Sequence, residues 1–158
     1  MQIALSIAPR LIFCGMAVWT VIGSAEAAPC LGGLKRALIS GHFSGSVDCG
    51  RDRLTVREIG RVRIRERNFV VYDYKYKLRP VCDGCAIHGG QRILIFDRGR
   101  YLGQYQTNFA RVSMRGGNLI FRPSVMFEPQ AQTSVVKITH RGVPKQIFAD
   151  GEDVSFFR

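Results

Sequence analysis

The sequence predicts a mainly β protein, a small antiparallel β-barrel or sandwich built as a meander of hairpins, with one short N-terminal helix. Two observations lead to this prediction. From Phe43 onward, short runs of β-branched and aromatic residues follow one another at close spacing. Turn sequences that contain glycine separate these runs, so neighbouring strands are expected to pair as hairpins.

The first part of the chain has the features of a secretory signal peptide. The apolar stretch 11–22 is about 12 residues long, whereas a membrane span needs roughly 20. Ala25 and Ala27 supply the small side chains that a signal peptidase requires at the end of the segment 1–27. We therefore expect a periplasmic or secreted protein in which residues 28–158 form a single β-rich domain without a transmembrane span.

The individual elements follow from local patterns. The spacing of apolar residues in 31–39 predicts a short amphipathic helix that Gly41 ends. Gly60 is expected to end one strand before the next begins. Residues 122–133, which contain two prolines, are expected to form a long surface loop. Turns are expected at 97–100, 116–117 and 150–151. The expected strands are 54–59, 61–67, 70–79, 92–96, 101–106, 110–114, 118–121, 135–140, 146–148 and 154–157.

Four cysteines remain once the predicted signal peptide is removed. An even number of cysteines in an exported chain predicts two disulfides in an oxidising compartment. We favour Cys30–Cys49 and Cys82–Cys85, because each pair joins sequence neighbours around turn-forming residues. Spacing alone leaves the two other connectivities open.

The segment around Cys82 and Cys85 has two alternative interpretations. The C-x-x-C spacing is that of a redox dithiol, and with His88 it makes half of a zinc site. In redox proteins this motif lies at the start of a helix. Here it is followed by Gly89, Gly90 and a β-type run, which do not form a helix. A zinc site needs further ligands, and the sequence has no second C-x-x-C pair. The sequence also contains no G-x-S-x-G, H-E-x-x-H or P-loop motif, so it predicts neither an enzyme nor a cofactor or metal.

Arginine occupies every second position in residues 61–67. Because successive side chains of a strand point to opposite faces, these arginines are expected to share one face. Residues 70–79 alternate in the same way between an apolar face and a charged face. Together the two segments predict a hairpin with one apolar and one basic face.

The register of this hairpin is predicted from the apolar pattern. A three-residue loop at 66–68 would pair Arg61 with Asp73 and Arg63 with Val71, which keeps the apolar side chains on one side of the sheet. The resulting basic face is the predicted anion-binding site, consisting of Arg61, Arg63, Arg65, Lys75, Lys77 and Arg79.

The charge of the chain supports an anionic ligand. The 158 residues include 23 Lys and Arg against 12 Asp and Glu, a net charge of +11. Cations that lie opposite each other on a sheet repel, so keeping them costs stability unless an anion or the solvent offsets it. The planar fork of arginine suits phosphate, sulfate and carboxylate groups. A basic face that is merely solvated is the competing interpretation.

The sequence therefore predicts a non-enzymatic binding domain. The expected ligand is an anionic envelope or extracellular component, such as a lipid head group, lipopolysaccharide or an acidic polysaccharide, and an acidic protein surface is a further candidate partner. Export argues against nucleic acid. The alternatives are a periplasmic enzyme or redox or metal protein centred on Cys82, Cys85 and His88, and a protein-binding or inhibitory module.

Overall fold

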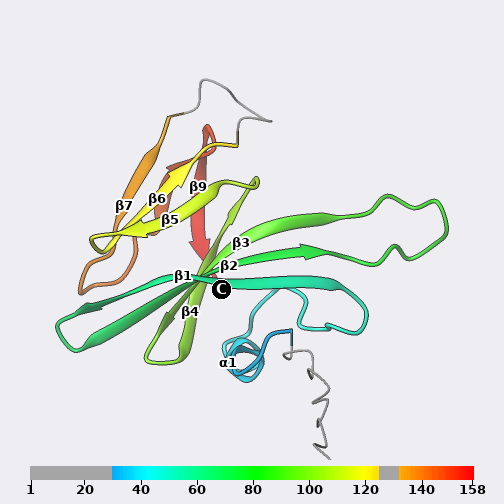
Figure 1. Cartoon of the computed structure of the whole chain (residues 1–158), viewed down its shortest axis with the longest axis horizontal. Coiled ribbons are helices and arrows are strands. Elements are labelled where there is room, and N and C mark those ends of the chain that lie inside the picture. Colours follow the sequence, from blue (N-terminus) through cyan, green and yellow to red (C-terminus); the bar gives the residue numbers. More distant parts are fainter. Residues whose placement is uncertain (1–29, 125–131) are drawn as a thin grey trace, which may run out of the picture.

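The computed structural model describes residues 30–124 and 132–158 (Figure 1). The predicted signal peptide and residues 125–131 of the predicted long loop lie outside the described residues. The elements are α1 (Leu34–Ser40), β1 (Arg53–Ile64), β2 (Arg67–Lys77), β3 (Gly89–Asp97), β4 (Arg100–Thr107), β5 (Arg111–Arg115), β6 (Asn118–Arg122), β7 (Ser134–Lys137), β8 (Gln146–Ala149) and β9 (Glu152–Phe157).

The prediction of a mainly β, antiparallel protein with one short helix is confirmed. One sheet has six strands in the order β1-β2-β3-β4-β9-β8, and a second has three in the order β5-β6-β7. The described residues form no closed barrel. The path is also not a single meander, because β9 returns to pair with β4 after the chain has formed the second sheet.

Helix α1 and the predicted hairpin turns form where the sequence places them. Gly41 follows the helix, and a Cβ at this position would lie 2.7 Å from the ring of Tyr101, so glycine allows α1 to approach β4. Each predicted turn has two successive residues with positive φ, which is the requirement of tight two-residue hairpins. These residues are Arg98 and Gly99, Gly116 and Gly117, and Asp150 and Gly151.

The prediction that Gly60 ends a strand is wrong. β1 continues through it, and its pairing with β2 shifts between Glu58 and Gly60, so Ile59 is the extra residue of a β-bulge. A Cβ at Gly60 would lie 3.1 Å from the Cβ of Met114 on β5. Glycine here therefore serves the close approach of the second sheet rather than a chain break.

The predicted register of the β1–β2 hairpin is also wrong. The loop has two residues, Arg65 and Glu66, and Arg65 takes a φ of 55°. Arg63 consequently pairs with Asn68 rather than Val71, and Arg61 pairs with Val70 rather than Asp73. The prediction assumed that one face of β2 is wet, whereas β2 carries apolar side chains on both faces.

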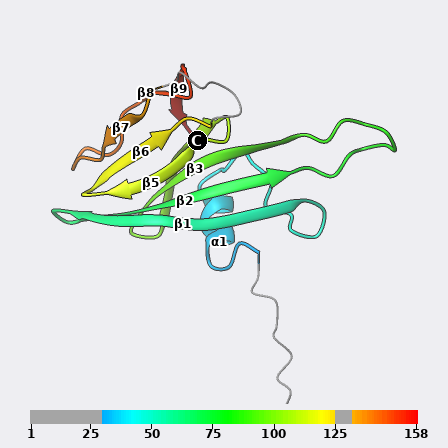
Figure 2. The ribbon, with the colours of Figure 1, turned by 45° about the horizontal axis from the view of Figure 1, so that its top comes forward.

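Two hydrophobic clusters cover the two faces of the six-stranded sheet. The first lies between the two sheets and includes Phe69, Ile95 and Phe121. The second includes Tyr74 and Leu94 on the opposite face, which α1 and the segment after it cover. Figure 2 shows α1 and the three-stranded sheet on opposite sides of the long strands, and the β2–β3 connection extends beyond both.

The Cys30–Cys49 disulfide ties the beginning of the described chain to the loop before β1. We expect Cys30→Ser/Cys49→Ser to lower the free energy of unfolding by about 3 kcal/mol, because the bond closes a loop with a sequence separation of 19. Urea denaturation without reductant measures the change. Cys82→Ser/Cys85→Ser, with a separation of 3, is the control and should lose about 2 kcal/mol or less. A larger loss in the control would contradict this account.

Candidate functional site

The six predicted anion-binding residues do not share one face of the sheet. Paired residues of an antiparallel ladder project to the same side, and successive residues project to opposite sides. Arg61 and Arg63 pair with Val70 and Asn68, which places them on the side of the second cluster. Lys75 and Lys77 have the opposite parity along β2 and project to the other side. The proposed single basic face is therefore not formed.

Local contacts divide the six residues further. Arg61 forms a bidentate ion pair with Glu58, with nitrogen–oxygen distances of 2.8 and 2.6 Å. The Nζ atom of Lys75 lies 3.7 Å from a carboxylate oxygen of the buried Asp73. Arg65 belongs to the hairpin loop. Lys77 and Arg79 lie at the far end of the hairpin, where they join a different group of cations.

A pocket of about 400 Å³ opens at this far end. We call it the basic pocket, because four of its seven lining residues are cationic. The lining residues are Arg51, Arg53, Lys77, Leu78, Arg79, Pro80 and Ile87.

The strands and their connections place these cations together. Arg53 and Lys77 are paired at the end of the β1–β2 ladder, so their side chains project from the same face. Arg51 precedes β1 by one turn residue, and Arg79 follows β2. The backbone N–H of Arg79 donates to Oδ1 of Asp52 at 3.1 Å, which joins the two sides of the pocket. Residues that are 28 positions apart in the chain thus form one site.

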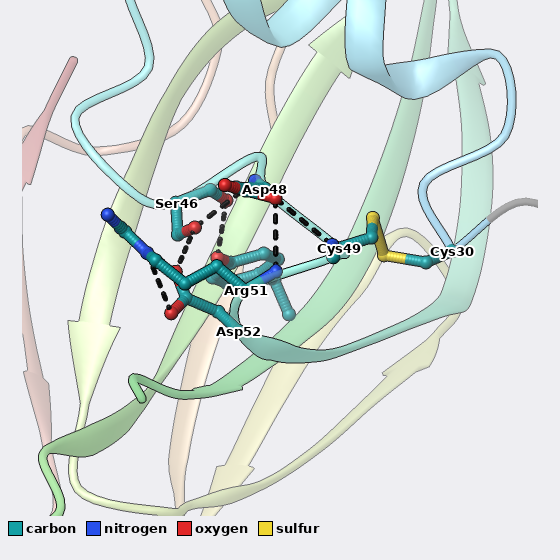
Figure 3. Close-up of a disulfide and its surroundings, with 8 residues drawn as sticks. Cys30, Ser46, Asp48, Cys49, Arg51 and Asp52 are labelled. Atoms are coloured by element: carbon teal, nitrogen blue, oxygen red, sulfur yellow. Dashed lines mark hydrogen bonds and ion pairs between the residues drawn. A yellow bond between two sulfur atoms is a disulfide. The ribbon is translucent and has the colours of Figure 1, made fainter. Parts of the chain in front are cut away.

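The loop before β1 is fixed by its own side chains, as Figure 3 shows. Oδ1 of Asp48 accepts hydrogen bonds from the backbone N–H groups of Gly50 and Arg51 at 3.0 and 3.1 Å. The Oγ of Ser46 donates to Asp52. The Cys30–Cys49 disulfide lies in the same loop. Arg51 is therefore presented by a loop whose backbone is held at several points.

Asp52 is the carboxylate that belongs to this site, and it is already engaged. Its side chain is buried and accepts hydrogen bonds from Ser46, from the guanidinium of Arg51 and from the Arg79 backbone. These interactions, with that of Ser46 the largest, lower the pKa of Asp52 to about 2. The hydrogen bond to Asp52 and its charge in turn raise the pKa of Arg51. Asp52 is therefore ionised at neutral pH and neutralises Arg51.

The other three cations of the basic pocket lack such a partner. Within residues 30–124 and 132–158, no carboxylate forms an ion pair with the side chains of Arg53, Lys77 or Arg79. All three residues are exposed, so the charges face solvent at the mouth of the pocket. This group differs from Arg61, Lys75 and the other paired cations because its charge is free to meet a ligand.

The C-x-x-C segment borders the same pocket. Cys82 and Cys85 form a disulfide with a Cα–Cα distance of 5.4 Å, as the sequence predicts for this pair. The backbone N–H of Leu78 donates to the carbonyl of His88 at 2.7 Å, which closes the base of the loop. In the part of the chain that the structure describes, no three His, Cys, Asp or Glu residues are grouped as metal ligands. With both sulfur atoms in the disulfide, these cysteines hold no free thiol for zinc.

Sequence reasoning missed Arg51 and Arg53. The signal available was the density of cations, since ten lie between residues 51 and 79. The pairing of Arg53 with Lys77 follows only from the true register, which depends on the two-residue loop and the bulge at Ile59.

Comparison with protein-family models, curated proteins and solved structures gives no significant match to this chain. Among the described residues, no helix has both the length and the apolar character needed to cross a membrane. The two disulfides fit an oxidising compartment, as in the periplasm or outside the cell. The function is therefore argued from the chemistry of the site.

The low pKa of Asp52 makes its contribution to stability depend on pH. Its folded pKa of about 2 lies below the ordinary value of 3.8, so the contribution is complete above the ordinary value and disappears as the pH falls through about 2. We expect Asp52→Asn to have a lower urea midpoint than the wild type at pH 6, with the difference shrinking between about pH 4 and pH 2. Parallel urea titrations across this range measure it. A difference that stays constant down to pH 2 would show that the Asp52 charge is not the cause.

Proposed function

We propose that this protein is an exported, non-enzymatic binding domain that holds anionic groups of an envelope or extracellular ligand in the basic pocket. The candidate ligands are lipid head groups, lipopolysaccharide and acidic polysaccharides. The observation that supports this most directly is the gathering of Arg53, Lys77 and Arg79 around one pocket without ion-pair partners among the described residues.

The energetics of the pocket favour an anion. Arg53 and Lys77 face each other across the ladder, and like charges in that position destabilise a sheet. A bound phosphate, sulfate or carboxylate would offset this repulsion, and the arginines can bind it through two parallel N–H groups. Leu78, Pro80 and Ile87 form the apolar part of the lining.

We also propose that the two sheets form a β-sandwich, one of the two architectures that the sequence predicts. The first hydrophobic cluster contains residues of both sheets, for example Phe69 of β2 and Phe121 of β6. This face-to-face packing supports a sandwich rather than a barrel. The basic pocket then lies at one end of the large sheet, beyond the part that the small sheet covers.

The binding test removes two cations of the pocket. We expect Arg53→Thr/Lys77→Thr to weaken binding to anionic liposomes, lipopolysaccharide or an acidic polysaccharide by about ten-fold, because each cation forms a charge-assisted contact. Salt-titrated binding measures the affinity, which should fall as the salt concentration rises. Threonine is chosen because it suits a strand.

A matched control separates the pocket from charge in general. Arg63→Thr/Arg65→Asn also removes two exposed cations but at the other end of the hairpin, and asparagine tolerates the positive φ of residue 65. The control should bind within about two-fold of the wild type, because only screened long-range attraction is lost. Equal losses in both variants, or none in either, would remove the basic pocket as the binding site.

The same pocket variant has an expected effect on stability. Because Arg53 and Lys77 repel each other across the ladder, Arg53→Thr/Lys77→Thr should raise the free energy of unfolding by about 0.5 kcal/mol. Chemical denaturation at low salt measures the change, and added salt should reduce it. A loss of stability would mean that the two cations support the fold rather than a ligand.

A further inference from the structure

The connection between β2 and β3 carries the most exposed large apolar side chains among the described residues. Val81 is 98% exposed and Ile87 is 66% exposed. Exposed apolar side chains that gather on a projecting segment indicate a contact surface rather than a folding element. We call residues 80–87 the tip, and Figure 1 shows that their loop extends away from both sheets.

The tip is held in shape by its own bonds. The Cys82–Cys85 disulfide closes its centre, and the backbone N–H of Cys85 donates to the carbonyl of Cys82 at 3.3 Å. The hydrogen bond from Leu78 to His88 joins the two sides of the base. A projecting loop that is restrained in this way loses less conformational entropy when it meets a partner.

The tip and the basic pocket are parts of one surface. Pro80 and Ile87 line the pocket together with its cations. Asp83 is the one acidic residue in the segment 78–88. At the base Asp52 pairs with Arg51, which leaves Arg53, Lys77 and Arg79 without an ion pair among the described residues. An apolar end above a basic collar matches the chemistry of an anionic bilayer, in which acyl chains lie beneath a layer of phosphate groups.

We propose that the tip inserts Val81 and Ile87 into the surface of an anionic phospholipid bilayer while the basic pocket binds head-group phosphates. This inference rests on the proposed function, since it identifies phospholipid as the source of the anion. The disulfide restrains the centre of the tip, between Val81 and Ile87. The cations of the basic pocket lie at the base of the tip, where the head groups would be.

The first test compares two apolar variants on vesicles. Val81→Ser/Ile87→Ser should bind mixed phosphatidylglycerol–phosphatidylcholine vesicles about ten-fold more weakly than the wild type. The reason is that the variant lacks the two apolar side chains whose transfer from water into the bilayer favours binding. Val135→Ser/Phe148→Ser removes two exposed apolar side chains from β7 and β8 and serves as the control. The control should stay within about two-fold of the wild type, and neither pair is needed for the core.

The second test detects insertion directly. Trp19 is the one tryptophan of the chain and lies in the predicted signal peptide 1–27, so the domain 28–158 gives a background without tryptophan fluorescence. Val81→Trp in this background should show a blue shift with the anionic vesicles and quenching by brominated phospholipid. Val135→Trp is the control and should show neither. Full water exposure of the reporter at position 81 on vesicles that bind the protein would overturn the inference.

The outcomes distinguish the inference from the proposed function. Soluble acidic polysaccharide should bind Val81→Ser and the wild type equally, because it offers no apolar phase and Val81 does not line the basic pocket. If Arg53→Thr/Lys77→Thr loses vesicle binding while Val81→Ser/Ile87→Ser retains it, the inference fails and the proposed function stands. If both variants bind vesicles and polysaccharide as tightly as the wild type, the proposed function fails and the inference fails with it.

Discussion

Burial of β2 and β3 on both faces is the constraint on which the rest of this structure depends. Phe69 and Val71 enter the cluster between the sheets, while Val70 and Tyr74 enter the cluster beneath α1. Both sets of side chains leave water only if the second sheet and the N-terminal segment cover opposite faces of the large sheet. Apolar burial thereby accounts for the layers and constrains the register of the β1–β2 hairpin.

How far the covering layers extend along the large sheet determines where cationic side chains are exposed to solvent. Along β2 the last buried side chains are Asp73 on one face and Tyr74 on the other, and Tyr76 is half-buried. Beyond that point Lys77 is exposed, and the chain continues into the tip without a covering layer. Some cations that lie near the layers pair with acids, as Arg67 does with Asp97 at 2.9 Å. Beyond the layers, Arg53, Lys77 and Arg79 line the basic pocket without such a partner among the described residues.

Two disulfide bonds restrain the end of the domain that the second sheet and α1 do not cover. The Cys30–Cys49 disulfide holds the loop that presents Arg51, and the Cys82–Cys85 disulfide holds the tip. Between them the buried carboxylate of Asp52 accepts hydrogen bonds from both sides of the pocket. A small domain with an uncovered end gains from such bonds, because they restrict the unfolded chain without requiring additional core. The same bonds can keep a ligand-binding surface ordered before a ligand arrives.

The sequence by itself determined the class of fold and its local elements. Turn residues with positive φ and the helix that Gly41 follows are set by local chemistry, which acts over a few residues. The sequence favoured both cysteine pairs but left the other connectivities open, and the structure selects these two. Alternation also placed Lys77 and Arg79 among the candidate binding residues. The prediction of a single basic face assumed that one side of β2 is exposed to solvent. Whether a side of β2 is exposed depends on elements that are distant from it in the sequence. Only the tertiary structure decided the register, the bulge at Ile59 and the pairing of Arg53 with Lys77, because which faces are covered depends on where β5 and α1 pack.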